Sequence, residues 1–495
     1  MLKPKQMMRG LYQFKDTCNV YVLAFEKCSI AIDFGSGKWI KALSQLNLPP
    51  LKHVYLTHHH ADQCEGLIEL GSKRPFIVHA PTGERDLIAH PGRKPPGPTG
   101  VPASYSPLKN GLKNIKYDTV GFTNHFIGDQ RIRFIDTPGH GRGAISILID
   151  HNDKQIVFCG DAAHAGATIH QPYHLEWDHW TGEGALAAWQ GICRLAGLNM
   201  DKLYPSHGPT IERQPRVMLK QLAGKLLDFV KVKGNICPGE PDRYLKPSFT
   251  KSGARLIADN LYQFGENGYL LVSQSGNCLV IDPFIADLAA LDKLLTELSN
   301  VRITDVTATH YHSDHIDGVP ILKKQHRAKL HLHPRVAKPI ARIGEYNVPW
   351  LVKRAIRPNK FMPVRGTWRW NEYTLRVAPF AGQTWWHCCM MTTIGGQKVF
   401  FGGDSFQPNS RWNGTGGFCS LNGSRFKEGF IRSAKLVLNW KPDLLACGHS
   451  THYRFAPSQF RKIIHWAQKA QHTTEALCPT GQLNRDYYLH PLERD

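Results

Sequence analysis

The chain has 495 residues, of which 42% are hydrophobic and 20% are charged. This length exceeds what one ordinary core holds, so two or three domains are expected, and the composition excludes a largely disordered protein. The formal net charge of +21 favours anionic partners, such as an acidic small molecule, a nucleic acid or a membrane surface. The lysines and arginines are dispersed and form no dense run, so nucleic acid is an open but less favoured partner.

The cysteines and the N-terminal segment bear on the cellular compartment. The 12 cysteines form no CxxC pair and have no regular spacing, apart from the adjacent Cys388 and Cys389. In a chain of this length, that pattern indicates reduced and mostly buried thiols, which predicts a cytoplasmic protein. The N-terminal segment has no apolar run of the signal-peptide type, and no stretch approaches the roughly 18 apolar residues that span a bilayer. We therefore expect no membrane span, and the oligomeric state is open.

The chain contains an internal repeat. The sequence LYQF at residues 11–14 recurs at residues 261–264, a separation of 250 positions. In each copy two short runs of β-branched and aromatic residues follow and end on an aspartate, at residues 19–33 and 268–282, which predicts a β-hairpin. Further strand-like runs recur in the same order and end on a histidine or an aspartate: His58 and His310, Asp161 and Asp404, and His207 and His449.

Helical patterns lie between these strands. Apolar positions near helical spacing predict helices at residues 183–196, 217–232 and 286–298. Strands that alternate with helices indicate a layered α/β fold.

The repeat also predicts the domain boundaries. A first domain is expected at residues 1–232 and a second at residues 247–495, joined by a linker at residues 233–246 that contains prolines and glycine. Residues 91–107 are rich in proline and glycine and predict a long loop within the first domain. Such a loop is either a substrate lid or a domain-packing arm.

Each copy carries a cluster of histidines with an aspartate directly after a strand. The first copy reads THHHADQ at residues 57–63, and the second reads THYHSDH at residues 309–315. Side chains two positions apart in an extended segment point to the same side, so each motif presents two imidazoles together. Neutral imidazoles and carboxylates are ligands of zinc, iron or manganese. The sequence therefore predicts a metal site in each copy.

These motifs resemble the HxHxDH signature of the metallo-β-lactamase superfamily, and the later ligand segments follow in the order of that family. The resemblance covers nearly all of both copies and implies two tandem αββα-sandwich domains. It also implies a metal-dependent hydrolase with one or two zinc ions per domain, iron or manganese being alternatives. The HxHxD reading, in place of HxExD, weighs against the diiron flavoprotein branch of the family.

For the first copy, the resemblance implies two metal positions that share one aspartate. The implied ligands are His58, His60 and His140 for one metal, Asp62 and His207 for the other, and Asp161 between them. Gln63 stands where the family has a histidine ligand. A carboxamide oxygen is a weaker zinc ligand than an imidazole, so the second metal is expected to be weakened or lost, whereas the three-histidine position is intact.

The second copy departs from the family at a different position. Its implied ligands are His310, His312, Asp314, His315, Asp404 and His449. Gln383 stands where the counterpart of His140 is expected, and His387, four residues later, is either a substitute ligand or a residue that orients the loop. Because this copy keeps the complete HxHxDH, it is the favoured two-metal catalytic centre. The first copy is then a one-metal site, a structural site or a decayed duplicate.

The resemblance implies hydrolysis by a metal-bound hydroxide, for which no serine or cysteine nucleophile is required. The candidate catalytic residues are Asp62, Asp161, Asp314 and Asp404. A small ester, thioester or lactone, which is anionic if the net charge reflects the substrate, is the favoured substrate class. Two alternatives stay open: a phosphodiesterase or nuclease that acts on nucleic acid, and a non-catalytic binding or assembly protein with structural metals.

Aromatic and histidine residues near the two sites have two interpretations. Trp385, Trp386 and Trp412 either line a substrate pocket of the second copy or pack in its core. Several histidines follow Asp161 in the first copy and either line the cleft or lie on the surface: His164, His170, His174 and His179.

Overall fold

The structure is a computed structural model that describes residues 2–71, 74–91, 108–118, 124–177, 181–234, 245–406, 417–450 and 452–490. It divides into two compact units. The first comprises Met1–Asp178, Gly182–Val230 and Thr473–Tyr487, and the second comprises His179–Thr181, Lys231–His472 and Tyr488–Asp495. A segment from near the C-terminal end of the sequence thus completes the first unit, which the boundaries expected from the repeat do not include.

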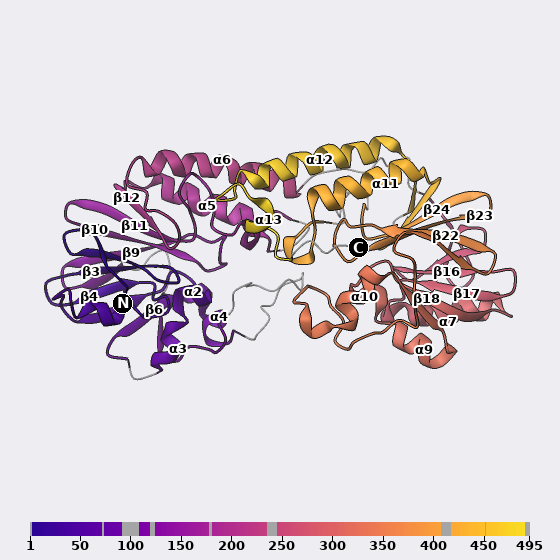
Figure 1. The fold of residues 1–495 in the computed structure, drawn as a ribbon, viewed down its shortest axis with the longest axis horizontal. Coiled ribbons are helices and arrows are strands. Elements are labelled where there is room, and N and C mark those ends of the chain that lie inside the picture. The colour runs from indigo at the N-terminus through magenta and orange to yellow at the C-terminus, as the bar shows by residue number, and fades with distance from the viewer. Residues whose placement is uncertain are drawn as a thin grey trace. The chain divides into compact units, whose positions relative to one another are not determined.

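The first unit contains two β-sheets (Figure 1). One sheet has seven strands in the order β1 to β7: β1 (Lys5–Met8), β2 (Leu11–Lys15), β3 (Asn19–Ala24), β4 (Ser29–Ile32), β5 (Leu51–Tyr55), β6 (Ile77–Pro81) and β7 (Ile115–Asp118). The other has five strands in the order β12-β11-β10-β9-β8: β8 (Asn124–Ile127), β9 (Gln130–Asp136), β10 (Ile145–His151), β11 (Lys154–Gly160) and β12 (Lys202–Pro205). The antiparallel pairing of β3 with β4 confirms the expected hairpin.

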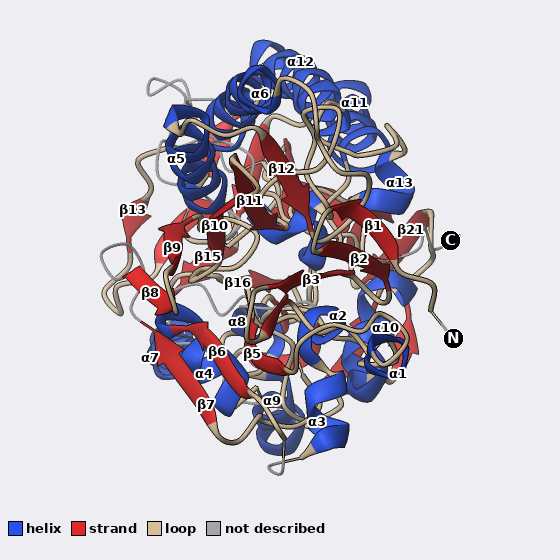
Figure 2. Ribbon diagram, turned by 90° about the vertical axis from the view of Figure 1, so that its left-hand side faces the viewer, coloured by secondary structure: helices blue, strands red, loops and turns tan. Residues whose placement is uncertain are grey.

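Helices cover the outer faces of both sheets of the first unit. In Figure 1, α5 (Glu183–Gly197) and α6 (Pro215–Gly234) lie over β11 and β12, on the side away from the short helices near β6. Figure 2 shows the same order of layers, with strands between two groups of helices. This is the expected αββα sandwich. The short helices are α1 (Ile40–Leu43), α2 (Ala61–Cys64), α3 (Gly66–Leu70) and α4 (Arg85–Ala89), and α13 (Leu483–Asp486) belongs to the C-terminal segment.

The alternation of side chains along β3 explains why two cores form. Val20 and Val22 are buried in a cluster with residues of α1 to α4. Tyr21 and Leu23 point the other way and are buried in a cluster with residues of β9, β10 and β11. Successive side chains of a strand face opposite sides of the sheet, so a continuous apolar run fills both the helix–sheet and the sheet–sheet layers.

The second unit repeats this architecture. Its eight-stranded sheet runs in the order β13 (Ser248–Phe249), β14 (Arg255–Ala258), β15 (Leu261–Phe264), β16 (Gly268–Val272), β17 (Asn277–Ile281), β18 (Arg302–Thr307), β19 (Lys329–Leu332) and β20 (Lys360–Phe361). Its six-stranded sheet runs in the order β21 (Gly366–Trp370), β22 (Tyr373–Pro379), β23 (Cys388–Ile394), β24 (Gln397–Gly403), β25 (Leu444–Cys447) and β26 (His452–Arg454). Its helices are α7 (Leu288–Leu298), α8 (Ser313–Ile316), α9 (Val319–His326), α10 (Pro334–Ala341), α11 (Arg432–Trp440) and most of α12 (Pro457–Glu475).

The three helices expected from periodicity all occur, as α5, α6 and α7. The third begins two residues later than expected, because Ile285–Asp287 forms a 3₁₀ turn ahead of it. Two expected loops fall largely outside the described residues: positions 92–107 of the proline-rich segment, and positions 235–244 of the linker.

The state of the cysteines and the search for a membrane-spanning helix concern two further expectations from the sequence. All of the cysteines among them are free thiols, and only Cys193 is exposed. In the part of the chain that the structure describes, no helix has the length and apolar character needed to cross a membrane.

Candidate metal centres

The candidate ligands of each unit follow strands that end at one edge of the sheets. In the first unit they come directly after β5, β9, β11 and β12, and in the second after β18, β22, β24 and β25. Strands are rigid, so the short segments that follow them are held in fixed positions while their side chains remain accessible.

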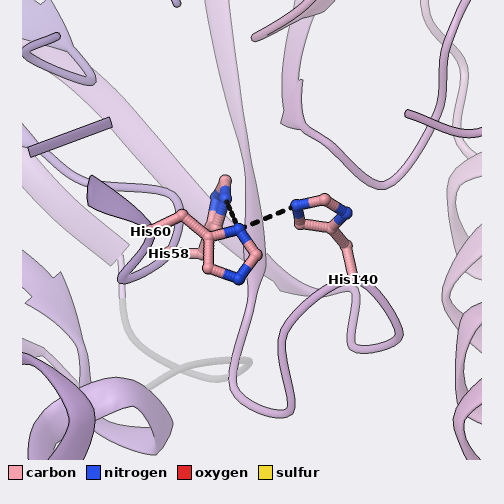
Figure 3. Close-up of side chains that lie close together, drawn as sticks. All are labelled: His58, His60 and His140. Carbon is pink, nitrogen blue, oxygen red and sulfur yellow. Dashed lines mark hydrogen bonds between the residues drawn. The ribbon is translucent and has the colours of Figure 1, made fainter. Parts of the chain in front are cut away.

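Three histidines of the first unit converge on one point (Figure 3). The His60 Nδ1 atom lies 3.1 Å from His58 Nε2 and 2.9 Å from His140 Nε2. Asp161 Oδ2 lies 3.6 Å from the same nitrogen of His58 and 3.4 Å from that of His140. Four ligand atoms at 2.0–2.1 Å from a tetrahedral zinc are about 3.3 Å apart, so these separations fit a zinc-sized ion.

The protonation of the histidines also suits a metal. Burial, reinforced by the neighbouring His174, lowers the pKa of both His60 and His140 well below the usual value. Both rings are therefore neutral at pH 7, and a neutral imidazole offers a lone pair to a metal. His59, between the two ligands in sequence, faces elsewhere, since its Nδ1 contacts the carboxylate of Glu84.

A second group in the first unit surrounds His207. Its Nδ1 lies 2.8 Å from Asp161 Oδ1, and its Nε2 lies 3.2 Å from Asp62 Oδ2. Burial disfavours the charged imidazole, but the two carboxylates outweigh it and raise the pKa of His207 to about 11. His170 belongs to the same group, because ligand atoms of Asp62, His170 and His207 all lie within 4.8 Å of one another.

A buried aspartate orients the first ligand of each unit through a threonine. The Thr57 hydroxyl lies 3.0 Å from Asp33 Oδ1 and 3.0 Å from His58 Nδ1. The hydroxyl donates to the carboxylate and accepts from the imidazole N–H, which leaves the Nε2 lone pair of His58 facing the other ligands. Asp282, Thr309 and His310 repeat this arrangement in the second unit.

In the second unit, the aspartate and histidine of the HxHxDH motif are assembled around Asp404. Its Oδ1 lies 3.1 Å from His315 Nε2, and its Oδ2 lies 3.1 Å from His449 Nε2. Asp314 Oδ2 lies 3.6 Å from His449 Nε2 and 3.7 Å from His315 Nε2. The other nitrogen of His315 lies 3.2 Å from Asp282. A carboxylate on the far side of the ring is common for histidine ligands of zinc, because it orients the imidazole.

The remaining candidate ligands of the second unit, His310 and His312, form a smaller group with Asp404. His312 Nε2 lies 3.0 Å from the Asn422 carboxamide oxygen, which fixes the proton on Nε2 and leaves Nδ1 for a ligand role. Burial lowers the pKa of His310 well below the usual value. The buried Nε2 of His310 has no hydrogen-bond partner among the described residues, as expected for an atom whose partner is a metal.

A sequence profile of the metallo-beta-lactamase superfamily matches residues 14–209 and 261–449, which together are most of the chain. The chain belongs to this superfamily. The two matches correspond to the two units, so the tandem duplication of the metallo-beta-lactamase domain is confirmed.

Several individual proteins are similar to parts of the chain. It is 30% identical over 164 residues to the metallo-beta-lactamase fold-containing protein ST1585 of Sulfurisphaera tokodaii, a match that covers 32% of this chain and 60% of that protein. It is 25% identical over 244 residues to the lactamase-like protein vrtG of Penicillium aethiopicum, covering 46% and 65%. A shorter match of 56 residues, 41% identical, joins it to a hydroxyacylglutathione hydrolase of Pseudomonas savastanoi, covering 11% and 21%. Each match spans less than two thirds of the relative's own length.

Solved metallo-beta-lactamase structures are also similar to part of the chain. The Rm3 metallo-beta-lactamase has 18% identity and a TM-score of 0.37, and the match covers 46% of this chain and 93% of that one. The class B3 di-zinc metallo-beta-lactamase LRA-12 from an Alaskan soil metagenome has 15% identity and a TM-score of 0.36, covering 47% and 94%.

Each unit departs from the metallo-beta-lactamase ligand pattern by one glutamine, and the two glutamines behave alike. Gln63 Nε2 donates to Asp161 Oδ2 at 3.2 Å, and Gln383 Nε2 donates to Asp404 Oδ2 at 3.3 Å. Each carboxamide thus turns its N–H toward the carboxylate shared by the two groups of its unit.

His387 lies beside the group that contains His310 and is not part of it. Its ring stacks on His310 with centroids 4.9 Å apart, and its Nδ1 donates to the Cys388 carbonyl at 2.9 Å. The candidate ligand group of this part of the unit does not include it. Its buried Nε2 has no hydrogen-bond partner among the described residues, as for His310 Nε2, so both interpretations made from the sequence stay predictions.

Two of the three candidate pocket tryptophans, Trp385 and Trp386, are buried. The guanidinium carbon of Arg335 lies over the Trp385 ring, 4.2 Å from the centroid of that ring. Trp386 packs edge-on against Tyr311 and Tyr346. Both belong to the hydrophobic core of the second unit. Their lining of a substrate pocket stays a prediction, and Trp412 and His179 lie outside the described residues.

Sequence reasoning missed the residues that support the ligands. Asp33 and Asp282 are buried behind the site and adopt left-handed backbone conformations, with φ of +56° and +55°. A signal that could have found these two aspartates was present in the sequence, because the repeated hairpin ends on Asp33 in the first copy and on Asp282 in the second. Asn422 had no such repeat. His174 was named from the sequence as a residue of the cleft or the surface, and it contacts the site, since its Nδ1 lies 3.3 Å from His140 Nδ1.

Replacing Asp282 with asparagine is expected to weaken metal binding by the second unit by about 10- to 100-fold, because the carboxylate orients His315. Asparagine tolerates the left-handed backbone at this position, so the fold is kept. Asp33→Asn is the matched control, because both substitutions disturb the contact to the threonine, but only Asp282 also contacts an imidazole, that of His315. Competition titrations with a chromophoric chelator measure both effects, and a loss no greater than that of Asp33→Asn would contradict the role of Asp282.

Replacing Gly139 with alanine is expected to destabilise the first unit by about 2–4 kcal/mol. Gly139 has a φ of +139°, and an added Cβ would lie 2.4 Å from the Cβ of Ala188 on α5. The control Gly166→Ala has a φ of +79° but no atom within 4 Å of its new Cβ, so only the backbone strain of about 1 kcal/mol applies. Urea unfolding measures the difference, and equal losses would show that the packing of the His140 loop on α5 contributes little.

Proposed function

We propose that the chain is a metal-dependent hydrolase that acts on a small ester, thioester or lactone. The observation that carries the proposal is the convergence of His58 Nε2, His60 Nδ1 and His140 Nε2 on the buried carboxylate of Asp161. The second unit assembles a comparable group around Asp404. Membership in the metallo-beta-lactamase superfamily, whose members are mostly hydrolases, supports the same conclusion.

The donor set fits zinc, and the proposed zinc sites are those named for each unit. A divalent metal held there would lower the pKa of a water molecule toward neutrality and polarise a substrate carbonyl. The chain's own contribution is to keep the imidazoles neutral, through burial, and correctly oriented, through Asp33 and Asp282. The buried carboxylates of Asp161 and Asp404 supply the negative charge between the ligand groups.

The four candidate catalytic aspartates divide into two pairs by exposure. The Asp161 and Asp404 side chains are 1% and 3% exposed, whereas those of Asp62 and Asp314 are 34% and 28% exposed. The buried pair is suited to hold ligands and orient a water molecule. We assign to the exposed pair the transfer of protons between the site and solvent, because these carboxylates contact both.

The cysteines beside the first site are unsuited to act as nucleophiles. Burial raises the pKa of both Cys64 and Cys159, so both remain thiols at neutral pH. The thiol is a poor nucleophile compared with the thiolate. This supports water as the attacking group.

A substrate panel tests the proposal. The purified chain is assayed with p-nitrophenyl acetate, an acylated glutathione thioester, a small lactone and bis(p-nitrophenyl) phosphate, before and after chelation and after addition of zinc, manganese or iron. We expect hydrolysis of at least one carbonyl substrate to fall by at least about 10²-fold on chelation and to return with metal. Preference for the phosphodiester would overturn the substrate class in favour of a phosphodiesterase. Bound metal without any turnover would overturn the hydrolase and favour a binding protein.

A further inference from the structure

The loss of a histidine at Gln63 is accommodated by a second change in the first unit. In the second unit, His315 Nδ1 lies 3.2 Å from the buried Asp282. In the first unit the corresponding aspartate, Asp33, accepts instead from the Ser206 hydroxyl at 2.6 Å. Asp33 therefore keeps a hydrogen-bond donor at the carboxylate oxygen that an imidazole would otherwise contact.

The residue before the last candidate histidine ligand also differs between the units, and this difference accompanies the change from His315 to Gln63. Ser206 immediately precedes His207, and Gly448 immediately precedes His449. A Cβ on Gly448 would lie 2.9 Å from the His315 ring and 2.2 Å from an Asp404 carboxylate oxygen. A side chain at this position would therefore crowd both the His315 imidazole and the Asp404 carboxylate. The exchange of glycine for serine fits a maintained first unit better than a decaying one.

Another imidazole lies close to the ligands that Gln63 leaves incomplete. The His170 ring stacks on His207 with centroids 3.9 Å apart and planes at 9°. A ligand atom of His170 lies within 4.8 Å of ligand atoms of both His207 and Asp62. This residue comes from the segment after Asp161, outside the ligand positions that the superfamily pattern assigned in the sequence.

The segment that carries His170 is held in place from several sides. Ile169 is buried, and its N–H donates to the Leu477 carbonyl of the C-terminal segment at 3.1 Å. Lys225 of α6 donates to the Ala167 carbonyl at 2.7 Å. His170 is thus presented by a braced segment, as a metal ligand requires.

We propose that His170 replaces the ligand lost at Gln63 and completes a second divalent-metal site in the first unit. Its partners in the group are Asp62 and His207, and Asp161 Oδ1 lies 2.8 Å from His207 Nδ1 beside them. Two imidazoles with carboxylates are a set suited to zinc or manganese. The inference rests on the proposed function of this site as a metal centre.

Cobalt(II) binding tests the assignment without any measurement of turnover. The full-length wild-type chain and His170→Ala are titrated with cobalt(II) chloride while the visible absorption of the bound ion is recorded. We expect His170→Ala to bind one equivalent less and to lose the matching part of the absorption. The control is His151→Ala, another histidine of the first unit, whose Nε2 bonds to the Arg9 carbonyl at 2.8 Å and which is expected to behave as wild type.

A rescue variant makes the test specific to the position of the lost ligand. Gln63→His and Ser206→Gly, introduced together into His170→Ala, copy the arrangement of the second unit and are expected to restore the missing equivalent. Unchanged cobalt binding in His170→Ala, an equal loss in His151→Ala, or no recovery in the triple variant would each overturn the assignment. Failure of the proposed hydrolase would differ, because it would leave these cobalt equivalents unaltered while no substrate is turned over.

Discussion

Replacing both Asp161 and Asp404 with asparagine is expected to lower metal-dependent hydrolysis by at least about 10³-fold. Each carboxylate is buried and lies within 4 Å of histidines from both ligand groups of its unit. Asparagine preserves the shape but removes the negative charge and one ligand oxygen. Both candidate ligand groups of a unit should therefore lose affinity for metal together.

The two single variants measure how much of the hydrolytic activity each unit contributes. If both units turn over substrate, Asp161→Asn and Asp404→Asn each keep the share of the other unit, and only the double variant loses all of it. Asp292→Asn, an exposed aspartate of α7, is the control and should retain wild-type activity. A double variant within 10-fold of wild type would contradict the proposed role of these carboxylates.

Replacing Gln383 with histidine is expected to raise the affinity of the second unit for a second metal by on the order of 10²-fold or more. Gln383 is buried at the position where the first unit has His140, and its carbonyl oxygen has no hydrogen-bond partner among the described residues. An imidazole there would join His310 and His312 and complete a three-histidine group. Little existing structure is lost in the exchange, since the carboxamide makes one hydrogen bond, to Asp404.

Zinc competition titrations with a chromophoric chelator measure this gain. Gln383→Leu has a similar size but no ligand atom, so its affinity should not exceed that of wild type. If Gln383→His binds zinc no more tightly than Gln383→Leu, the group around His310 is not a metal site.

The amino-acid sequence predicted the fold because the chain repeats itself. The recurrence of strand-like runs before His58 and His310, and before Asp161 and Asp404, defined both domains and their ligand edges. The αββα layers followed from the resemblance that these motifs carry. Residues that stand at the end of a strand in both copies are predictable because their position in the sheet is fixed locally.

The rest of the site depends on contacts between segments that no local pattern connects. His170 approaches His207 only because the segment after Asp161 folds back, and Leu477, 308 positions after Ile169, contributes to its placement. The serine at position 206 compensates for Gln63 through Asp33, a relation that needs three distant segments to be seen together. The sequence named His170 only as one of several histidines that either line the cleft or lie on the surface, and no periodicity or spacing singled it out or marked Ser206.

The metal content of the purified chain tests the central claim most directly. Elemental analysis of wild type, His60→Ala and His312→Ala, all purified without chelator, counts the ions bound per chain. We predict about three to four equivalents for wild type and a loss of at least one equivalent in each variant, because each histidine belongs to a different unit. A wild-type chain without bound metal, or variants with an unchanged content, would contradict the assignment of two metal centres.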